Sequence, residues 1–192
     1  MAIVTASEVV NYTDISTSAP AIITSGLIPI VQDRVAEICF DNFTSGDIYR
    51  QGSVTFNAAA RTIESSTGST AWLSLGFAAD DEVYVYNSHR NDGYYNVQSI
   101  SSTTMTLAAG ETVVAELSGA SVLVSLVVWP KTLKYTAAQM VKYDYDDRPA
   151  RQAGLASQSL GPRSESYTAA VGNTYGYPAE LIDALPRVAR LM

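Results

Sequence analysis

The chain has 192 residues, a formal net charge of −7 and only 16% charged residues, while 47% are hydrophobic. The 21 serines, 17 threonines and 12 tyrosines therefore supply much of the polar surface, a composition that favours strands and loops. The apolar content excludes a disordered chain, the acidity argues against a sequence-reading nucleic-acid binder or an anionic-membrane binder, and the single cysteine excludes an internal disulfide framework.

Two helical patterns open the chain. Thr5 and Glu8 have the spacing of a capping box, which predicts a short helix that begins there. A second helix is expected from about Pro20, because apolar residues then recur every three or four positions. These residues are Ile23, Leu27, Val31, Val35 and Ile38. Pro29 lies inside this stripe and predicts a kink or break, and the turn residues 44–47 are expected to end the helix.

Residues 47–130 have the alternation of strands. The predicted strands are 53–56, 61–64, 82–86, 94–100, 104–107 and 121–128. Asp92-Gly93 predicts a tight hairpin turn between the third and fourth strands. Six short strands in this block favour a small barrel or sandwich. The block also carries −5 of the net charge, with three basic and eight acidic residues.

A helical pattern returns after residue 130 and is expected to end before Arg148-Pro149. Gly161-Pro162 then predicts a turn between two short extended segments, and Tyr177-Pro178 begins a final helix. We therefore expect an α+β protein in which residues 1–46 and 131–192 form a small helical bundle. A β-barrel or sandwich of residues 47–130 is inserted in it, and a short hairpin or extended segment precedes the C-terminal helix.

Candidate catalytic groups are few. His89 is the only histidine and lies near Ser88 and Asp92, but neighbouring strand residues point to opposite faces and no GxSxG nucleophile elbow is present. An exposed loop histidine is therefore the preferred interpretation. Asp80, Asp81 and Glu82 lead into a strand, where consecutive acidic residues are typical of a turn rather than of an acid–base pair.

Two further groups are interpreted as structural. Asp144, Asp146 and Asp147 lack the glycine and later glutamate of a calcium loop, which favours a solvated acidic helix end. Cys39 lies on an apolar helix face and is expected to be a buried side chain. No phosphate-binding glycine loop and no CxxC motif occurs. We therefore expect no enzymatic activity, no cofactor and no metal.

Two strings resemble the head-tail connector, or adaptor, proteins of tailed bacteriophages. One is the opening, residues 5–12, followed by a longer helix that ends at residues 35–40. The other is the Ser-Gln-Ser-Leu-Gly-Pro-Arg-Ser-Glu-Ser-Tyr segment of residues 157–167, followed by the proline-started helix from residue 177 and the terminal arginines. The resemblance covers about 108 residues outside the β block. The block itself is absent from the simplest members, and it resembles β-modules inserted in several phage virion proteins.

The resemblance implies a structural virion protein, made in the host cytoplasm, that forms a ring-shaped homo-oligomer under the portal. Such a ring has the portal's twelve-fold symmetry, extends the DNA channel and docks the tail or the next neck protein. DNA passes through without sequence-specific binding, and no membrane is involved. Because the family's C-terminal region reaches the portal, the resemblance places partner or subunit contacts on five residues: Arg163, Tyr167, Tyr177, Arg187 and Arg190.

Charge is compatible with that assignment, because the chain from Arg148 onward carries +2 while the β block carries −5, and opposite charges suit ring contacts or an acidic partner. Two alternatives stay open. One is another neck or tail-completion protein of the virion. The other, of a different class, is a carbohydrate-binding module or hydrolase that acts through the β block.

Overall fold

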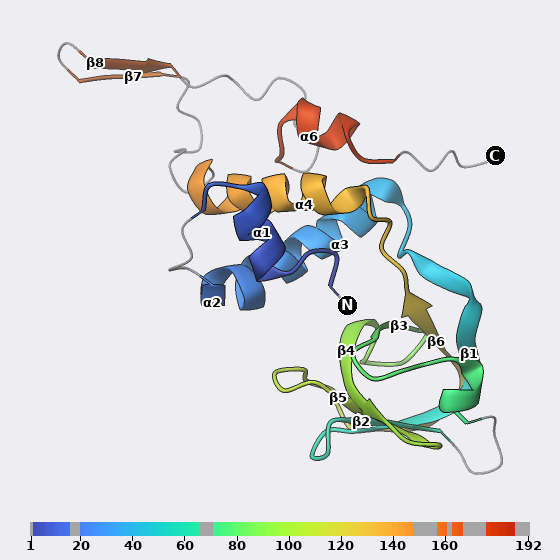
Figure 1. Ribbon diagram of the computed structural model, residues 1–192. Coiled ribbons are helices and arrows are strands. Elements are labelled where there is room, and N and C mark those ends of the chain that lie inside the picture. Colours follow the sequence, from blue (N-terminus) through green and yellow to red (C-terminus); the bar gives the residue numbers. More distant parts are fainter. Residues whose placement is uncertain are drawn as a thin grey trace. The chain divides into compact units, whose positions relative to one another are not determined.

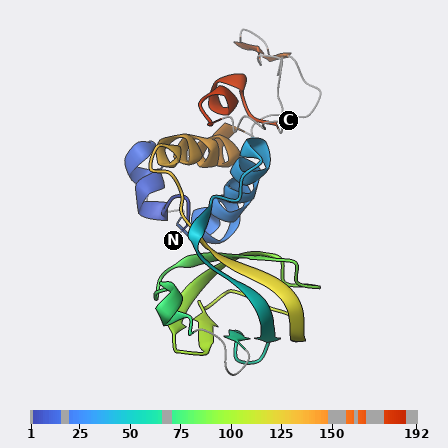
Figure 2. The same ribbon diagram turned by 90° about the vertical axis from the view of Figure 1, so that its right-hand side faces the viewer.

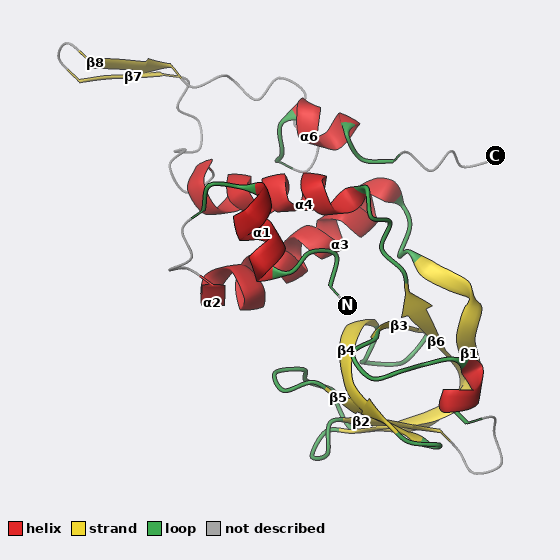
Figure 3. Ribbon diagram, in the orientation of Figure 1, coloured by secondary structure: helices red, strands yellow, loops and turns green. Residues whose placement is uncertain are grey.

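The chain forms two compact units, one of Asn42–Trp129 and one of Ala2–Asp41 together with the chain from Pro130 onward (Figure 1). The structure, a computed structural model, describes residues 2–15, 20–65, 71–147, 157–160, 163–166 and 176–186. The fold class is α+β, and the described helices of more than one turn all lie in the second unit (Figure 3). The sequence placed the unit boundaries slightly later, at 46/47 and 130/131.

The first unit is a closed barrel of six antiparallel strands in the spatial order β1-β2-β5-β4-β3-β6 (Figure 2). The strands are β1 (Thr44–Asn57), β2 (Thr62–Ser65), β3 (Glu82–Tyr86), β4 (Gly93–Ile100), β5 (Thr104–Leu107) and β6 (Glu116–Val127). The last strand pairs with both β1 and β3, which closes the barrel. A barrel is therefore formed rather than a sandwich, and closure removes the exposed strand edges.

The strand β1 begins nine residues before the predicted strand at 53–56, so the prediction that residues 44–47 end a helix is wrong. Thr44 pairs with Val127, and the register shifts before the next pair, Tyr49 with Ser125. This irregularity accommodates the turn-forming residues Ser45, Gly46 and Asp47 inside a strand, as a β-bulge does. Turn-like composition therefore masked the start of the strand.

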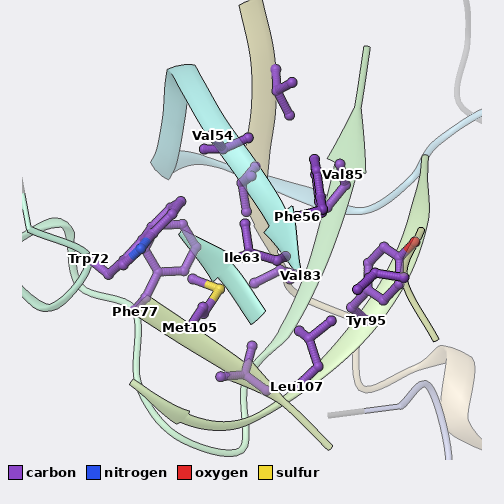
Figure 4. Packing of buried hydrophobic residues seen from close by; sticks show 14 residues of the cluster. Val54, Phe56, Ile63, Trp72, Phe77, Val83, Val85, Tyr95, Met105 and Leu107 are labelled. Carbon is purple, nitrogen blue, oxygen red and sulfur yellow. The ribbon is translucent and has the colours of Figure 1, made fainter. Parts of the chain in front are cut away.

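The barrel interior is filled by side chains that alternate along the strands (Figure 4). Trp72 is fully buried in this core. Its ring meets that of Phe77 edge-to-face, with 5.5 Å between the ring centroids, and its indole N–H donates a hydrogen bond of 3.1 Å to the carbonyl of Thr103. The guanidinium carbon of Arg50 lies 4.9 Å from the Trp72 ring centroid, a cation–π contact. The remaining core residues are Val54, Phe56, Ile63, Val83, Val85, Tyr95, Val97, Met105, Leu107, Val113, Val122 and Val124.

The second unit contains α1 (Ala6–Tyr12), α2 (Pro20–Ile22), a π-helical turn (Ile23–Leu27), α3 (Ile28–Cys39) and α4 (Leu133–Lys142), which continues into a second π-helical turn (Tyr143–Asp147). The predicted capping box is confirmed: the Thr5 hydroxyl accepts from the Glu8 N–H, and the Glu8 carboxylate accepts from the Thr5 N–H.

Proline and a left-handed residue set the ends of α3. Pro29 lies in the first turn of α3, but helical backbone precedes it, because Leu27 and Ile28 have right-handed helical angles and the Ile28 N–H donates to the carbonyl of Ile23. The missing N–H of Pro29 therefore interrupts the helical hydrogen bonds, and the irregularity in this helix is the π-helical turn that precedes Pro29. The helix ends at Cys39, because Phe40 has a φ of 53° and takes the left-handed cap position. The second helix is thus several residues shorter than predicted.

Three side chains of α4 bond to α1 or to the residues that follow it, and so attach α1 to α4. The Lys134 ammonium donates to the Glu8 carboxylate at 2.5 Å, and the Gln139 amide donates to the carbonyl of Tyr12 at 3.0 Å. Lys142 pairs with Asp14, just beyond the end of α1. These contacts join parts of the chain that are more than 120 residues apart in sequence, so they build one helical unit from both flanks of the barrel.

The C-terminal part contains a two-stranded antiparallel sheet of β7 (Ser157–Leu160) and β8 (Arg163–Ser166), followed by the short helix α6 (Ala179–Asp183). The hairpin expected before the C-terminal helix is therefore present, and Pro178 precedes the first residue of α6, as predicted. None of the helices in the described part of the chain has the length and apolar character that a membrane crossing requires.

We predict that Leu107→Ala destabilises the protein by ~2–5 kcal/mol, because it removes a fully buried side chain and leaves a cavity in the barrel. The matched substitution Leu117→Ala, at a side chain that is 88% exposed, should change the free energy of unfolding by less than ~0.5 kcal/mol. Urea denaturation of the two variants measures the difference. Equal effects would contradict the closed-barrel core.

We also predict that Glu8→Gln destabilises the protein at neutral pH by about 0.5 kcal/mol, a modest effect because the pair is partly solvated. Glutamine still fits the capping box, so the change removes mainly the charge beside Lys134. Partial burial raises the pKa of Glu8, but hydrogen bonds and charge from Lys134 and Thr5 outweigh it and hold the pKa below its ordinary value of 4.5.

A lowered folded-state pKa stabilises the fold above the unfolded-state pKa, and this stabilisation is lost as the pH falls through the lowered pKa. The difference between wild type and Glu8→Gln in thermal melts should therefore shrink below about pH 4.5. Glu180→Gln, at an exposed side chain of α6, is the control for the removal of one carboxylate charge from the chain.

Candidate functional site

The C-terminal segment of residues 176–186 is where the structure brings functional candidates together. Tyr177 is only 1% exposed, so in the single chain its side chain packs inside the protein's own fold. Its phenol donates a hydrogen bond of 2.5 Å to the carboxylate of Asp144, and its ring centroid lies 5.8 Å from that of Tyr143. A buried aromatic ring with a polar tip needs such an acceptor, so Tyr177 anchors the segment within the chain.

The other four predicted contact residues are not brought together in the described structure. Arg163 is the first residue of β8, opposite Leu160 in the hairpin. Tyr167, Arg187 and Arg190 lie outside the described residues. They stay predictions that rest on the family resemblance.

Asp144 corrects the interpretation of the acidic helix end. It is buried, whereas Asp146 is exposed, so the three aspartates do not form one solvated cluster. The π-helical turn of residues Tyr143–Asp147 widens the end of α4. It thereby directs Tyr143 and Asp144 inward together, because a helix with more residues per turn changes which neighbours share a face. The sequence contained no signal for this turn.

The loop between β3 and β4 is fixed by a network of hydrogen bonds. Asn91 is buried, and its side chain accepts from the N–H of Val114 at 2.7 Å and donates to the carboxylate of Glu116 at 2.8 Å. The Ser88 hydroxyl donates to Asp92 at 2.8 Å. The predicted β3–β4 hairpin is confirmed, but Asp92-Gly93 does not form a tight turn, because residues 87–92 all lie between the strands and Gly93 is the first residue of β4.

His89 does not take part in that network through its side chain. Its backbone N–H donates to Glu116 at 3.0 Å, and the residue is exposed. Ser88 instead bonds directly to Asp92. The three side chains are therefore not arranged as the nucleophile, base and orienting carboxylate of a catalytic triad.

The acidic run before β3 divides into a turn and a buried carboxylate. Asp80 has a φ of 66°, and the Asp81 carboxylate accepts from the N–H of Ala78 at 2.7 Å, which is turn geometry. Glu82 is only 1% exposed, and it accepts a 2.6 Å hydrogen bond from the indole N–H of Trp129. Within the described ranges, no group of three or more His, Cys, Asp or Glu side chains is arranged to hold a metal ion.

Four aromatic residues form a row that the sequence did not reveal. Trp129 lies 4.9 Å from Phe43 and 5.7 Å from Tyr94, and Tyr94 lies 4.8 Å from Tyr84, all between ring centroids. Tyr84 and Tyr94 are a directly opposed cross-strand pair, and such aromatic pairs stabilise a sheet. Phe43 and Trp129 come from the two ends of the barrel unit. They meet because β1 pairs with β6, a contact that the sequence pattern does not predict.

Comparisons with known proteins add no relative: no family model matches the chain, and no curated protein shows significant similarity to it.

We predict that Cys39 is unreactive in the folded protein. Its side chain is 1% exposed, and burial together with the nearby charge of Asp41 raises the pKa of the thiol to about 11. At about pH 8 the nucleophilic thiolate is therefore a very small fraction. Labelling with a thiol reagent should be slow in buffer and complete within minutes in denaturant, and fast labelling of the folded chain would contradict the burial.

Proposed function

We propose that this protein is a non-enzymatic structural component of a bacteriophage neck, an adaptor that assembles as a ring between the portal and the tail. The observation that carries the proposal is the order of the elements outside the barrel. A capped short helix, a longer helix, a third helix, a hairpin and a proline-started helix follow one another, which is the order in the family that the two strings resemble.

The position of the barrel supports the same proposal. It lies between α3 and α4 in the chain, and α1 is bound to α4 by Glu8–Lys134 and Asp14–Lys142. The two chain segments on either side of the barrel therefore pack together as one helical unit, although the barrel separates them in sequence. An insertion of this kind adds a module to a connector core without altering the core.

The charge distribution supports the passage of DNA rather than its binding. The protein carries a net charge of −7, and Asp47, Asp80 and Asp92 are exposed on the barrel unit. An acidic wall repels phosphates, so DNA can move along it without adhering. The +2 charge of the chain from Arg148 onward suits an acidic partner, for which we propose the portal, with Arg163, Tyr167, Arg187 and Arg190 as contacts.

We predict that the purified protein forms a ring on its portal. Mass measurement and negative-stain images of the protein alone and mixed with portal provide the test, because neck proteins can be monomers until their template is present. A protein that stays monomeric in the presence of excess portal would overturn the adaptor proposal. Binding to a glycan array without portal binding would instead favour the carbohydrate-binding alternative.

The C-terminal contacts are tested separately by deleting Pro178–Met192. We expect loss of portal binding with an unchanged barrel, which can be followed by the near-ultraviolet signal of the buried Trp72. The matched control is Leu117→Ala, which alters an exposed barrel side chain and should leave portal binding intact. Unchanged binding by the deletion variant would refute the C-terminal assignment.

A further inference from the structure

Residues 176–186, here the anchor segment, are attached to the helical unit through two buried side chains. Within the segment only Tyr177 and Leu185 are buried, while the other residues are exposed or half-buried. Its helix α6 has five residues, too few to be stable alone in water. The segment is therefore ordered by its docking, and the docking depends on these two side chains.

The surface that receives Tyr177, here the acceptor site, is selective for a phenol. Tyr143 supplies an aromatic wall, and the Asp144 carboxylate accepts the phenolic hydrogen bond. A hydrogen bond to a carboxylate in a buried site is strong, and removing the donor leaves a buried charge at a cost. Recognition therefore requires the hydroxyl as well as the ring.

The connection between the acceptor site and the anchor segment is long. Residues 148–175, 28 in number, separate the two along the chain, and the β7–β8 hairpin brings residues 157 and 166 opposite each other. The 18 residues outside the hairpin would span roughly 60 Å at full extension. In free solution such a connection favours the chain's own segment, but in a ring the segment of the adjacent copy is also held close to the acceptor site, so its local concentration is high as well. Exchange between copies would also make the same contacts and require no new ones.

We infer that, in the assembled ring, the anchor segment of each copy occupies the acceptor site of the adjacent copy. The occupant is thus a second copy of this chain, recognised through its Tyr177 phenol. The inference rests on the proposed ring, but the adaptor function does not require it. Exchange links each subunit to the next in one direction, and such a head-to-tail contact closes a ring when the rotation permits.

Two full-length variants test the exchange. Tyr177→Ala keeps the acceptor site but loses the anchor, and Asp144→Ala keeps the anchor but damages the acceptor site. Neither variant can exchange with itself, whereas a mixture offers one intact anchor and one vacant acceptor site. In sedimentation velocity we expect the mixture to associate at least about tenfold more tightly than either variant alone, the equivalent of ~1.4 kcal/mol.

Tyr135→Ala is the matched control, because it removes an exposed tyrosine of α4 and leaves both anchor and acceptor site in place. Its mixture with Asp144→Ala should associate no more than Asp144→Ala alone, since its acceptor site is already filled. Tyr177→Phe in place of Tyr177→Ala provides a milder variant if the alanine change unfolds the chain, and thermal melts verify folding.

A mixture of folded Tyr177→Ala and Asp144→Ala chains that stays monomeric would overturn the inference. It would also be overturned if rings of Tyr177→Ala on the portal were as stable to dilution as wild-type rings. Either result leaves the adaptor proposal standing, whereas failure of the wild-type chain to bind portal would overturn the adaptor proposal without bearing on the variant mixture.

Discussion

The pairing of β1 with β6 is the constraint on which the rest of the structure depends. These two strands begin and end the barrel unit, and they lie side by side because the barrel closes. The N–H of Val128 donates to the carbonyl of Phe43 at 2.8 Å, and Phe43 stacks against Trp129. The chain therefore enters and leaves the barrel at neighbouring points, the condition under which a domain can be inserted into another.

Because its ends meet, the barrel interrupts the helical unit without dividing it. The α1–α4 contacts Glu8–Lys134 and Asp14–Lys142 join residues more than 120 positions apart, and the entropic cost of so long a loop rises only slowly with its length. The barrel acts here as a loop whose two ends are held together by the pairing of β1 with β6. A barrel with splayed ends would instead pull α3 and α4 away from each other and weaken these ion pairs.

Local patterns predicted much of the fold. Alternation located all six strands, and Thr5 and Glu8 located the first helix, because such signals are properties of adjacent residues. Barrel closure could not be predicted, since it depends on the pairing of β1 with β6, which lie far apart in sequence, as in the pair of Thr44 with Val127. The start of β1 was missed because Ser45-Gly46-Asp47 has turn composition, and the bulge that accommodates it is a tertiary feature. The acceptor site could not be predicted for the same reason, because its Asp144 accepts the hydrogen bond of a tyrosine 33 positions away in sequence.

Some of the acidic side chains are buried, so the net charge of the chain overstates the negative charge of its surface. Glu82 and Asp144 are buried and accept hydrogen bonds from Trp129 and Tyr177, so neither carboxylate contributes an exposed charge to a surface. Glu8 and Asp14 are paired with lysines of α4. In the proposed adaptor, repulsion of DNA would therefore come from other carboxylates, including those exposed on the barrel. If the ring carries DNA through its centre, substitutions that neutralise exposed barrel carboxylates should affect DNA passage, whereas those at Asp144 should affect subunit exchange.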